Sequence, residues 1–267
     1  MKENLIKLYS HNEQVLLQKL DKLFDKWRRR WDENQYGWFI KDGFYPGYLS
    51  MKKKILFFAR DCYNIYHIDG TIPSYGCYIS EYIPQYTSGI LKGKSINVVR
   101  FHKLLVKITY ALLNGGNAPL PWQDVPSAKE ICNTGKIFHD ISFAFMNLGK
   151  LSHEGSSNAD WELIKEAVSF SIEGENLIKK EIELLSPDLI ISMNLNDNPH
   201  GINYLHKTFG KDIAPARNKI NDCNVYKVSL SHQKSVPLLD CWHFAGRFSE
   251  EYIWKPIYDA LSAIHFY

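Results

Sequence analysis

The chain has 267 residues, of which 45% are apolar and 23% are charged, and its formal net charge at pH 7 is +3. This composition is typical of a globular protein with one large core. The five cysteines are odd in number and form no CxxC pair, which argues against a disulfide framework and against zinc or iron–sulfur sites. No apolar run is long enough to span a membrane and the N-terminus lacks the apolar segment of a signal peptide, so we expect a cytoplasmic protein without membrane contact.

The predicted elements alternate between helices and strands, because the apolar residues change between helical and strand periodicity. Along the chain they are a helix at 3–31, a strand at 55–59, a helix at 99–113, a strand at 141–148, a helical stretch at 160–185, strands at 188–195, 224–230 and 236–244, and a helix at 248–264. Residues 64–95 and 114–136 are expected to be long loops rich in Gly and Pro, and long loops in a compact domain are usually functional.

This alternation predicts the fold class. Strands that alternate with helices form a parallel sheet with helices on both faces. We therefore predict an α/β protein, a three-layer α/β/α sandwich with a central parallel sheet of four or five strands. A single domain is expected to cover residues 1–267, with an N-terminal helical extension over about residues 1–45.

Polar side chains follow three of the predicted strands. Asp61 comes just after the first, Asn147 lies at the end of the second, and His243 lies at the end of the last. The carboxyl ends of parallel strands share one edge of the sheet, where α/β proteins bind ligands. A carboxylate, an amide and an imidazole are thus expected to share a site, although each alone could be an ordinary turn former, strand cap or half-buried side chain.

Four short motifs around these residues resemble those of the uracil-DNA glycosylase superfamily. ARDCYN (59–64) is similar to the family motif GQDPYH, and GCYIS (76–80) is similar to GLCFS. FMNLG (145–149) lies where the family has LLLN, and HFAGRF (243–248) resembles HPSPLS. The motifs occur in the family's order. The resemblance implies that the fold is uracil-DNA glycosylase-like and that the protein hydrolyses the N-glycosidic bond of a base flipped out of DNA.

The resemblance also implies a role for each matching residue. Asp61 would orient the attacking water and stabilise an oxocarbenium-like sugar, while His243 would donate to a carbonyl of the departing base. The implied base contacts are Tyr63, Tyr78 and Asn147, and the implied DNA contacts are Arg60, Arg247 and Ser152. DNA is the expected partner of a monomeric enzyme without cofactor or metal. No lysine lies in the matched motifs to form a Schiff base, so monofunctional catalysis is expected.

Several positions depart from the family pattern. Cys62 replaces the motif proline, Asn64 the histidine and Arg60 the glutamine, and the segment after His243 lacks the leucine that the family inserts into the duplex. In the family, the ring that matches Tyr63 rejects thymine by contact at C5, and these departures could move it aside. The substrate base is therefore left open between uracil and a 5-modified pyrimidine, in base-excision repair or in bacterial defence against phage with modified DNA.

Two other functions stay open on the sequence. A catalytically inactive nucleic-acid-binding module could have kept the fold, although an intact Asp61 with His243 argues against it. An unrelated α/β hydrolase could use Cys62 or Cys241 as its nucleophile. Cys241 lies two residues before His243, and pairs at this spacing rarely form a thiolate–imidazole dyad.

Overall fold

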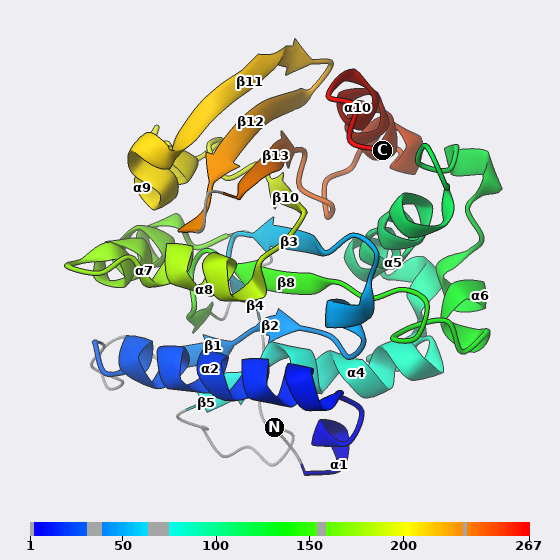
Figure 1. Ribbon diagram of the computed structural model, residues 1–267, viewed down its shortest axis with the longest axis horizontal. Helices are drawn as coiled ribbons and strands as arrows, with labels where there is room; N and C mark the ends of the chain where they lie inside the picture. Colours follow the sequence, from blue (N-terminus) through cyan, green and yellow to red (C-terminus); the bar gives the residue numbers. More distant parts are fainter. Residues whose placement is uncertain (1–2, 31–38, 64–74, 154–158, 232–233) are drawn as a thin grey trace.

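The structure is a computed structural model that describes residues 3–30, 39–63, 75–153, 159–231 and 234–267 (Figure 1). At its centre is a seven-stranded sheet in the order β11, β12, β13, β10, β3, β8, β2. The strands are β2 Gly43–Phe44, β3 Ile55–Ala59, β8 Ala144–Asn147, β10 Leu189–Met193, β11 Ile213–Ile220, β12 Cys223–Ser229 and β13 Ser235–Cys241. The four strands β8, β3, β10 and β13 are parallel, whereas the pairings of β2, β12 and β11 are antiparallel.

The predicted α/β class is confirmed, with four parallel strands at the centre of a mixed sheet. The strand predicted at 224–230 exists as β12, but it runs antiparallel, because only two residues, Asn221 and Asp222, join it to β11. β11 itself was not predicted. It is an edge strand that contains Pro215, and most of its described side chains are exposed, so it lacks the apolar alternation of a strand.

Helices flank the sheet in an arrangement compatible with three layers. The described helices are α1 Glu3–Ile6, α2 His11–Arg28, α4 Tyr78–Ser88, α5 Arg100–Asn114, α6 Ala128–Asn133, α7 Trp161–Ile172, α8 Leu177–Leu185, α9 Tyr204–Phe209 and α10 Glu250–Ala263. α8 packs against both α2 and α7, and α6 packs against both α4 and α5. Figure 1 shows α7 and α8 at the left of the picture and α5 and α6 at its right, with strands between them. Every residue of β3, β8 and β10 is buried, as expected for strands covered on both faces.

The helix predicted at 3–31 is divided into α1 and α2 at Ser10. Ser10 Oγ accepts from the backbone N–H of Glu13, and the Glu13 carboxylate accepts from the N–H of Ser10, which is a capping box. The N-terminal segment is part of the core rather than an appendage. Trp27 of α2 is fully buried and donates from Nε1 to Ser171 Oγ of α7 at 2.8 Å, and β2 forms one edge of the main sheet.

Three predicted segments contain more structure than expected. α4 lies within 64–95 and α6 within 114–136, and residues 160–185 form the two helices α7 and α8, separated near Gly174 at a φ of +68°. None of the described helices is both long and apolar enough to cross a membrane. The remaining elements are the strands β1 Phe39–Lys41, β4 Cys62–Tyr63, β5 Tyr75–Cys77, β6 Ile90–Leu91, β7 Lys94–Ser95 and β9 Ser152–His153, and the 3-10 helices η1 Tyr48–Ser50, η2 Ile96–Val98, η3 Trp122–Asp124 and η4 Gly210–Asp212.

Candidate active site

The order of the parallel strands creates a crevice at their carboxyl ends. β3 comes first in the chain, and the two parallel strands that follow it, β8 and β10, lie on opposite sides of it. In α/β sheets, such a change of direction is where ligands bind. A cavity of about 850 Å³ lies here. Its lining includes Asp61 after β3, Asn147 at the end of β8, Asn194 after β10 and His243 after β13.

The structure brings most of the predicted site residues together. Those that line the cavity are Arg60, Asp61, Tyr78, Asn147, His243 and Arg247. The side chains of Tyr63 and Ser152 lie outside the part of the chain that is described. Their backbones are close in the fold, because Cys62–Tyr63 (β4) pairs in parallel with Ser152–His153 (β9). The segments that follow β3 and β8 are therefore joined beside the cavity.

Asp61 lies directly beyond β3 and faces the start of α7. Its Oδ2 accepts a hydrogen bond from the backbone N–H of Asp160 at 3.0 Å. Asp160 is the N-cap of α7 and accepts from the N–H of Leu163 through Oδ1, also at 3.0 Å. The carboxylate of Asp61 is thus oriented by a backbone group at a capped helix end.

Arg60 forms part of the inner wall of the cavity. Its Nη2 donates to the carbonyl oxygen of Asn194 at 3.1 Å, and its guanidinium lies 4.9 Å from the ring centroid of Trp161. Burial lowers the pKa of Arg60, an effect that nearby carboxylates oppose, Asp197 most strongly. The side chain predicted to contact DNA is therefore already engaged with the protein, and it places a positive charge in the wall.

Asn147 presents an unsatisfied amide atom to the cavity. The residue is 1% exposed, its Nδ2 donates to Cys62 Sγ at 2.9 Å, and its Oδ1 has no hydrogen-bond partner among the residues that the structure describes. A buried carbonyl oxygen without a partner costs about 1–3 kcal/mol, so such atoms are rare in native proteins unless a ligand meets them. A thiol can accept or donate a hydrogen bond, so Cys62 supports either orientation of the amide. Asn147 therefore offers a ligand either an acceptor or a donor.

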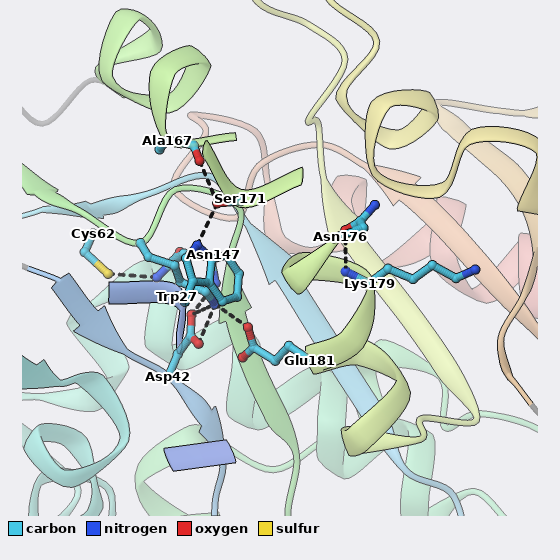
Figure 2. A network of polar contacts seen from close by, with 10 residues as sticks. Trp27, Asp42, Cys62, Asn147, Ala167, Ser171, Asn176, Lys179 and Glu181 are labelled. Carbon is cyan, nitrogen blue, oxygen red and sulfur yellow. Dashed lines mark hydrogen bonds and ion pairs between the residues drawn. The ribbon is translucent and has the colours of Figure 1, made fainter. Parts of the chain in front are cut away.

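A buried charge network holds Asn147 from behind (Figure 2). The backbone N–H of Asn147 donates to Asp42 Oδ2 at 2.6 Å. The same carboxylate binds Lys150 Nζ at 2.5 and 2.7 Å, and Lys150 Nζ lies 2.7 Å from Glu181 Oε2. The Lys150, Asp42 and Glu181 side chains are fully buried. The network ties the end of β8 to α8 and to the segment between β1 and β2.

The protonation states in this network follow from burial. Burial, and then the negative charge of Asp42, raise the pKa of Glu181 well above its usual value. Burial lowers the pKa of Lys150, but the two carboxylates outweigh it, so that the pKa of Lys150 is raised. Burial thus favours the protonated form of Glu181, and the cation of Lys150 is balanced by the anion of Asp42.

His243 enters the cavity as a neutral hydrogen-bond donor. Burial, and then the charge of Arg60, lower the pKa of His243 to about 4. The backbone N–H of Ala245 donates to its Nδ1 at 3.2 Å, so the proton of the neutral ring is on Nε2. The ring stacks on Phe101 at a centroid distance of 5.6 Å. Among the described residues, Nε2 has no hydrogen-bond partner, and this N–H is available to a ligand.

An aromatic wall completes one side of the cavity. Tyr78 begins α4 and stacks on Phe145 of β8, with ring centroids 4.5 Å apart and 17° between the planes. The ring centroid of Tyr82 lies 4.6 Å from that of Tyr78 and 4.3 Å from that of His102. Tyr78 is only 6% exposed, so a base in the cavity would meet the wall formed by these rings rather than the open face of Tyr78 alone.

The cysteines do not have the surroundings of nucleophiles. Cys62 and Cys241 are buried, and burial raises the pKa of both thiols well above the usual value. Cys241 Sγ lies 3.3 Å from Cys223 Sγ, its neighbour on β12. A catalytic cysteine needs a lowered pKa and access to solvent, so these contacts argue against a cysteine hydrolase.

Sequence reasoning missed several lining residues. Phe145 could have been found, because it lies two residues before Asn147 on a strand and so faces the same way. Trp161 and Phe101 come from helix starts that pack beside the cavity, and Lys92 follows the short strand β6. No sequence pattern pointed to these three positions.

The chain matches no protein-family model and no curated protein sequence. Within the residues that the structure describes, no three His, Cys, Asp or Glu side chains gather as they would to hold a metal ion. The functional argument therefore rests on the side chains of the cavity and on their surroundings.

Proposed function

We propose that this protein is a monofunctional DNA glycosylase, which hydrolyses the N-glycosidic bond of a uracil or modified pyrimidine flipped out of DNA. One observation carries the proposal. Three side chains line the same cavity, those of Asp61, Asn147 and His243. Among the described residues, Oδ1 of Asn147 and Nε2–H of His243 have no hydrogen-bond partner. The three side chains supply a carboxylate for the sugar, an amide for the base edge and a neutral donor for the base carbonyl.

The chemistry requires charge stabilisation on both sides of the breaking bond. As the C1′–N bond breaks, its electron pair goes to the base and the sugar becomes cationic at C1′. Asp61 stabilises this cation and orients the water whose oxygen bonds to C1′. The proton that this water loses is taken up by the base anion, so that the products are the neutral free base and an abasic sugar with a hydroxyl group at C1′. His243 donates from Nε2 to a carbonyl oxygen on which the negative charge of the base collects. A donor of this kind typically lowers a barrier by about 3–4 kcal/mol.

Asn147 would read the base by its hydrogen-bonding edge. A pyrimidine edge presents both donors and acceptors, and the amide of Asn147 has one atom free for it. The buried network of Lys150 and Asp42 holds the backbone of Asn147, and Cys62 holds its side-chain amide, while the DNA enters. The aromatic wall around Tyr78 and Phe145 provides the flat surroundings that a flipped base requires.

The cavity volume leaves room for either class of base. At about 850 Å³ it is large for a binding cavity, whose usual range is about 300–1,000 Å³. A 5-modified pyrimidine is therefore as compatible with the volume as uracil is. Uracil as substrate would place the protein in base-excision repair, and a bulky 5-modified cytosine would place it in defence against phage with modified DNA.

The test is a panel of DNAs, each with one different base, followed by hot alkali to break the chain at abasic sites. We expect cleavage of at least one DNA that carries uracil or a 5-modified pyrimidine, and a rate that is lower by about 10²-fold or more with Asp61→Asn. Asp197→Asn is the matched control, because Asp197 also lines the cavity but is assigned no contact with the sugar or the base. DNA binding without cleavage of any member of a broad panel would favour an inactive binding module.

A comparison of Tyr63→Ala with wild type would identify the class of base. If the ring of Tyr63 rejects a 5-substituent, the alanine variant gains activity on thymine while it keeps activity on uracil. If wild type cuts DNA with glucosylated hydroxymethylcytosine and leaves uracil intact, Tyr63 is no gate and the cavity is built for the modification.

A further inference from the structure

A row of aromatic side chains leads from the cavity to the surface. The rings of Trp242 and Phe248 have centroids 4.8 Å apart, and Phe248 stacks on Tyr252 at 5.0 Å with 22° between the planes. Trp242 and Phe248 line the cavity, and Tyr252 lies beyond it in the first turn of α10. Phe248 is 37% exposed and Tyr252 is 43% exposed, and no other Phe, Tyr or Trp whose side chain the structure describes is as exposed.

Polar contacts fix the segment that carries the two exposed rings. The carbonyl oxygen of Phe248 accepts a hydrogen bond from the guanidinium of Arg100, and the hydroxyl of Tyr252 donates to the carboxylate of Asp222. Ser249, between them in the chain, is the N-cap of α10 and accepts from the N–H of Tyr252 at 3.1 Å. A hydrophobic contact at a helix start would explain why the rings touch, but it does not require both to be open to solvent.

A positive charge lies next to the rings. Arg247 precedes Phe248, lines the cavity and is exposed, and it forms no ion pair with a described residue. Exposed rings beside an unpaired arginine are the combination by which proteins bind single-stranded nucleic acid, with bases on the rings and phosphates on the cations.

We propose that Phe248 and Tyr252 form a stacking platform for the base next to the flipped nucleotide, with Arg247 on the phosphate between the two. This inference rests on the proposed function, because it takes the cavity as the place of the flipped base. Phe248 belongs to both the cavity and the platform, so neighbouring nucleotides of one strand can occupy them together. The platform favours a strand whose bases are unpaired at this point over an intact duplex.

The test uses single-stranded oligonucleotides with the fluorescent base 2-aminopurine on the 5′ or the 3′ side of a uracil or of a glucosylated hydroxymethylcytosine. The protein carries Asp61→Asn so that the DNA is not consumed. Stacking quenches 2-aminopurine, so quenching is expected on one of the two sides. Phe248→Leu and Tyr252→Leu keep an apolar side chain but remove the ring. Each is expected to relieve the quenching and to weaken binding by about tenfold.

Three controls make the result specific. Tyr252→Phe keeps the ring and should keep the quenching. Leu49→Ala removes an exposed apolar side chain of similar exposure, 36%, which does not line the cavity, and should change neither signal. Arg247→Gln should reduce the salt dependence of binding by about one counterion without relieving the quenching.

The outcomes separate the platform from the proposed function. Unchanged quenching and affinity in both leucine variants, or absence of DNA binding, would overturn the platform. If those variants lose quenching while wild type releases no base from any DNA, the platform stands and the glycosylase proposal fails. If wild type releases a base and the leucine variants bind and quench as before, only the platform fails.

Discussion

The backbone N–H of Ala245 donates a hydrogen bond to Nδ1 of His243 over 3.2 Å, and this contact decides which ring nitrogen carries the proton. With Nδ1 occupied as an acceptor, the neutral ring directs an N–H donor into the cavity. The Ala245–Gly246 turn that supplies the contact begins four residues after the end of β13, and the N–H of Gly246 donates to the carbonyl oxygen of His243 at 2.8 Å. The donor is thus fixed before any substrate binds, as electrostatic catalysis requires.

The first prediction concerns His243 and pH. Because its pKa is lowered to about 4, the imidazole is neutral through the range from about pH 5 to pH 8. The rate of base release should therefore stay constant as the pH rises through 6.5. A histidine that acts as an acid with an ordinary pKa would instead lose activity there. His243→Ala should lower kcat about 10²- to 10³-fold at every pH in this range. A wild-type pH profile that falls with a midpoint near 6.5 and is flat in His243→Ala would show that the ring acts as a cation.

Asp61 should act on the transition state rather than on binding. Asp61→Asn is expected to lower kcat by about 10²-fold or more while the Kd for DNA stays within about twofold of wild type, because the sugar cation forms only during reaction. Single-turnover base release and fluorescence anisotropy measure the two quantities. Equal losses of turnover and binding would mean that Asp61 serves mainly to hold the start of α7 through Asp160.

The buried network behind Asn147 predicts that loss of the Lys150 charge lowers the free energy of unfolding much more than loss of the Glu181 carboxyl does. Lys150→Met leaves the anion of Asp42 buried without a partner and should cost about 3–5 kcal/mol of unfolding free energy. Glu181→Gln should cost less than about 1 kcal/mol, because burial favours the neutral form of Glu181, which glutamine imitates. Urea unfolding at neutral pH compares the two. Equal destabilisation by both variants would show that Glu181 is ionised in the folded protein.

Acid should destabilise the protein through its buried neutral histidines. Burial lowers the pKa of His102 to about 3 and that of His243 to about 4, both below the value of 6.5 of an unperturbed histidine. The unfolded state then binds more protons, so stability is present above about pH 6.5 and falls as the pH drops toward these values. Between its unfolded-state pKa and its folded-state pKa, each histidine lowers the free energy of unfolding by about 1.4 kcal/mol for each unit by which the pH falls.

His102→Asn is the variant that tests this slope. Asparagine can keep the hydrogen bond that Nδ1 of His102 forms with the hydroxyl of Tyr86 at 2.7 Å, but it does not titrate. The unfolding free energy of the variant should fall less steeply than that of wild type between about pH 6.5 and pH 4.5. Parallel slopes would contradict a neutral, buried His102.

The cavity should yield no covalent adduct with DNA. Lys150 is fully buried and its Nζ contacts both Asp42 and Glu181, so its amine is unavailable for a Schiff base. Lys92 is the described lysine that lines the cavity, and it lies in none of the motifs that resemble glycosylases. Borohydride in the reaction is expected to trap no protein–DNA adduct. An adduct that forms with wild type and disappears in Lys92→Ala would show a lyase step and overturn the monofunctional assignment.

The sequence predicted the elements whose burial is uniform. The run ILFFA at 55–59 became β3 residue for residue, because a strand covered on both faces is apolar throughout. Prediction from the sequence failed where two interacting residues lie far apart in the chain. Asp42 and Lys150 are 108 residues apart, and no local pattern signals that their side chains form an ion pair. α4 was missed because Pro84 lies inside it, and α4 is a helix because its buried tyrosines pack in the aromatic wall.

The site was predictable only as a set of strand ends. Parallel strands bring their carboxyl ends to one edge, so Asp61, Asn147 and His243 could be grouped from the sequence. Their chemical states depend on groups that the sequence does not connect to them. The lowered pKa of His243 comes from burial and from Arg60, and Asn147 is held at its side-chain amide by Cys62 and at its backbone by Asp42.

The most direct measurement of the proposed activity is the stoichiometry of its two products. Wild type is incubated with DNA that contains a single candidate base, the free base is quantified by mass spectrometry, and abasic sites are counted as alkali-labile breaks in the same sample. Hydrolysis of the N-glycosidic bond predicts equal amounts of the two for at least one pyrimidine, with both reduced by about 10²-fold or more in Asp61→Asn and in His243→Ala. Strand breaks without free base, or equal yields from wild type and Asp61→Asn, would contradict it.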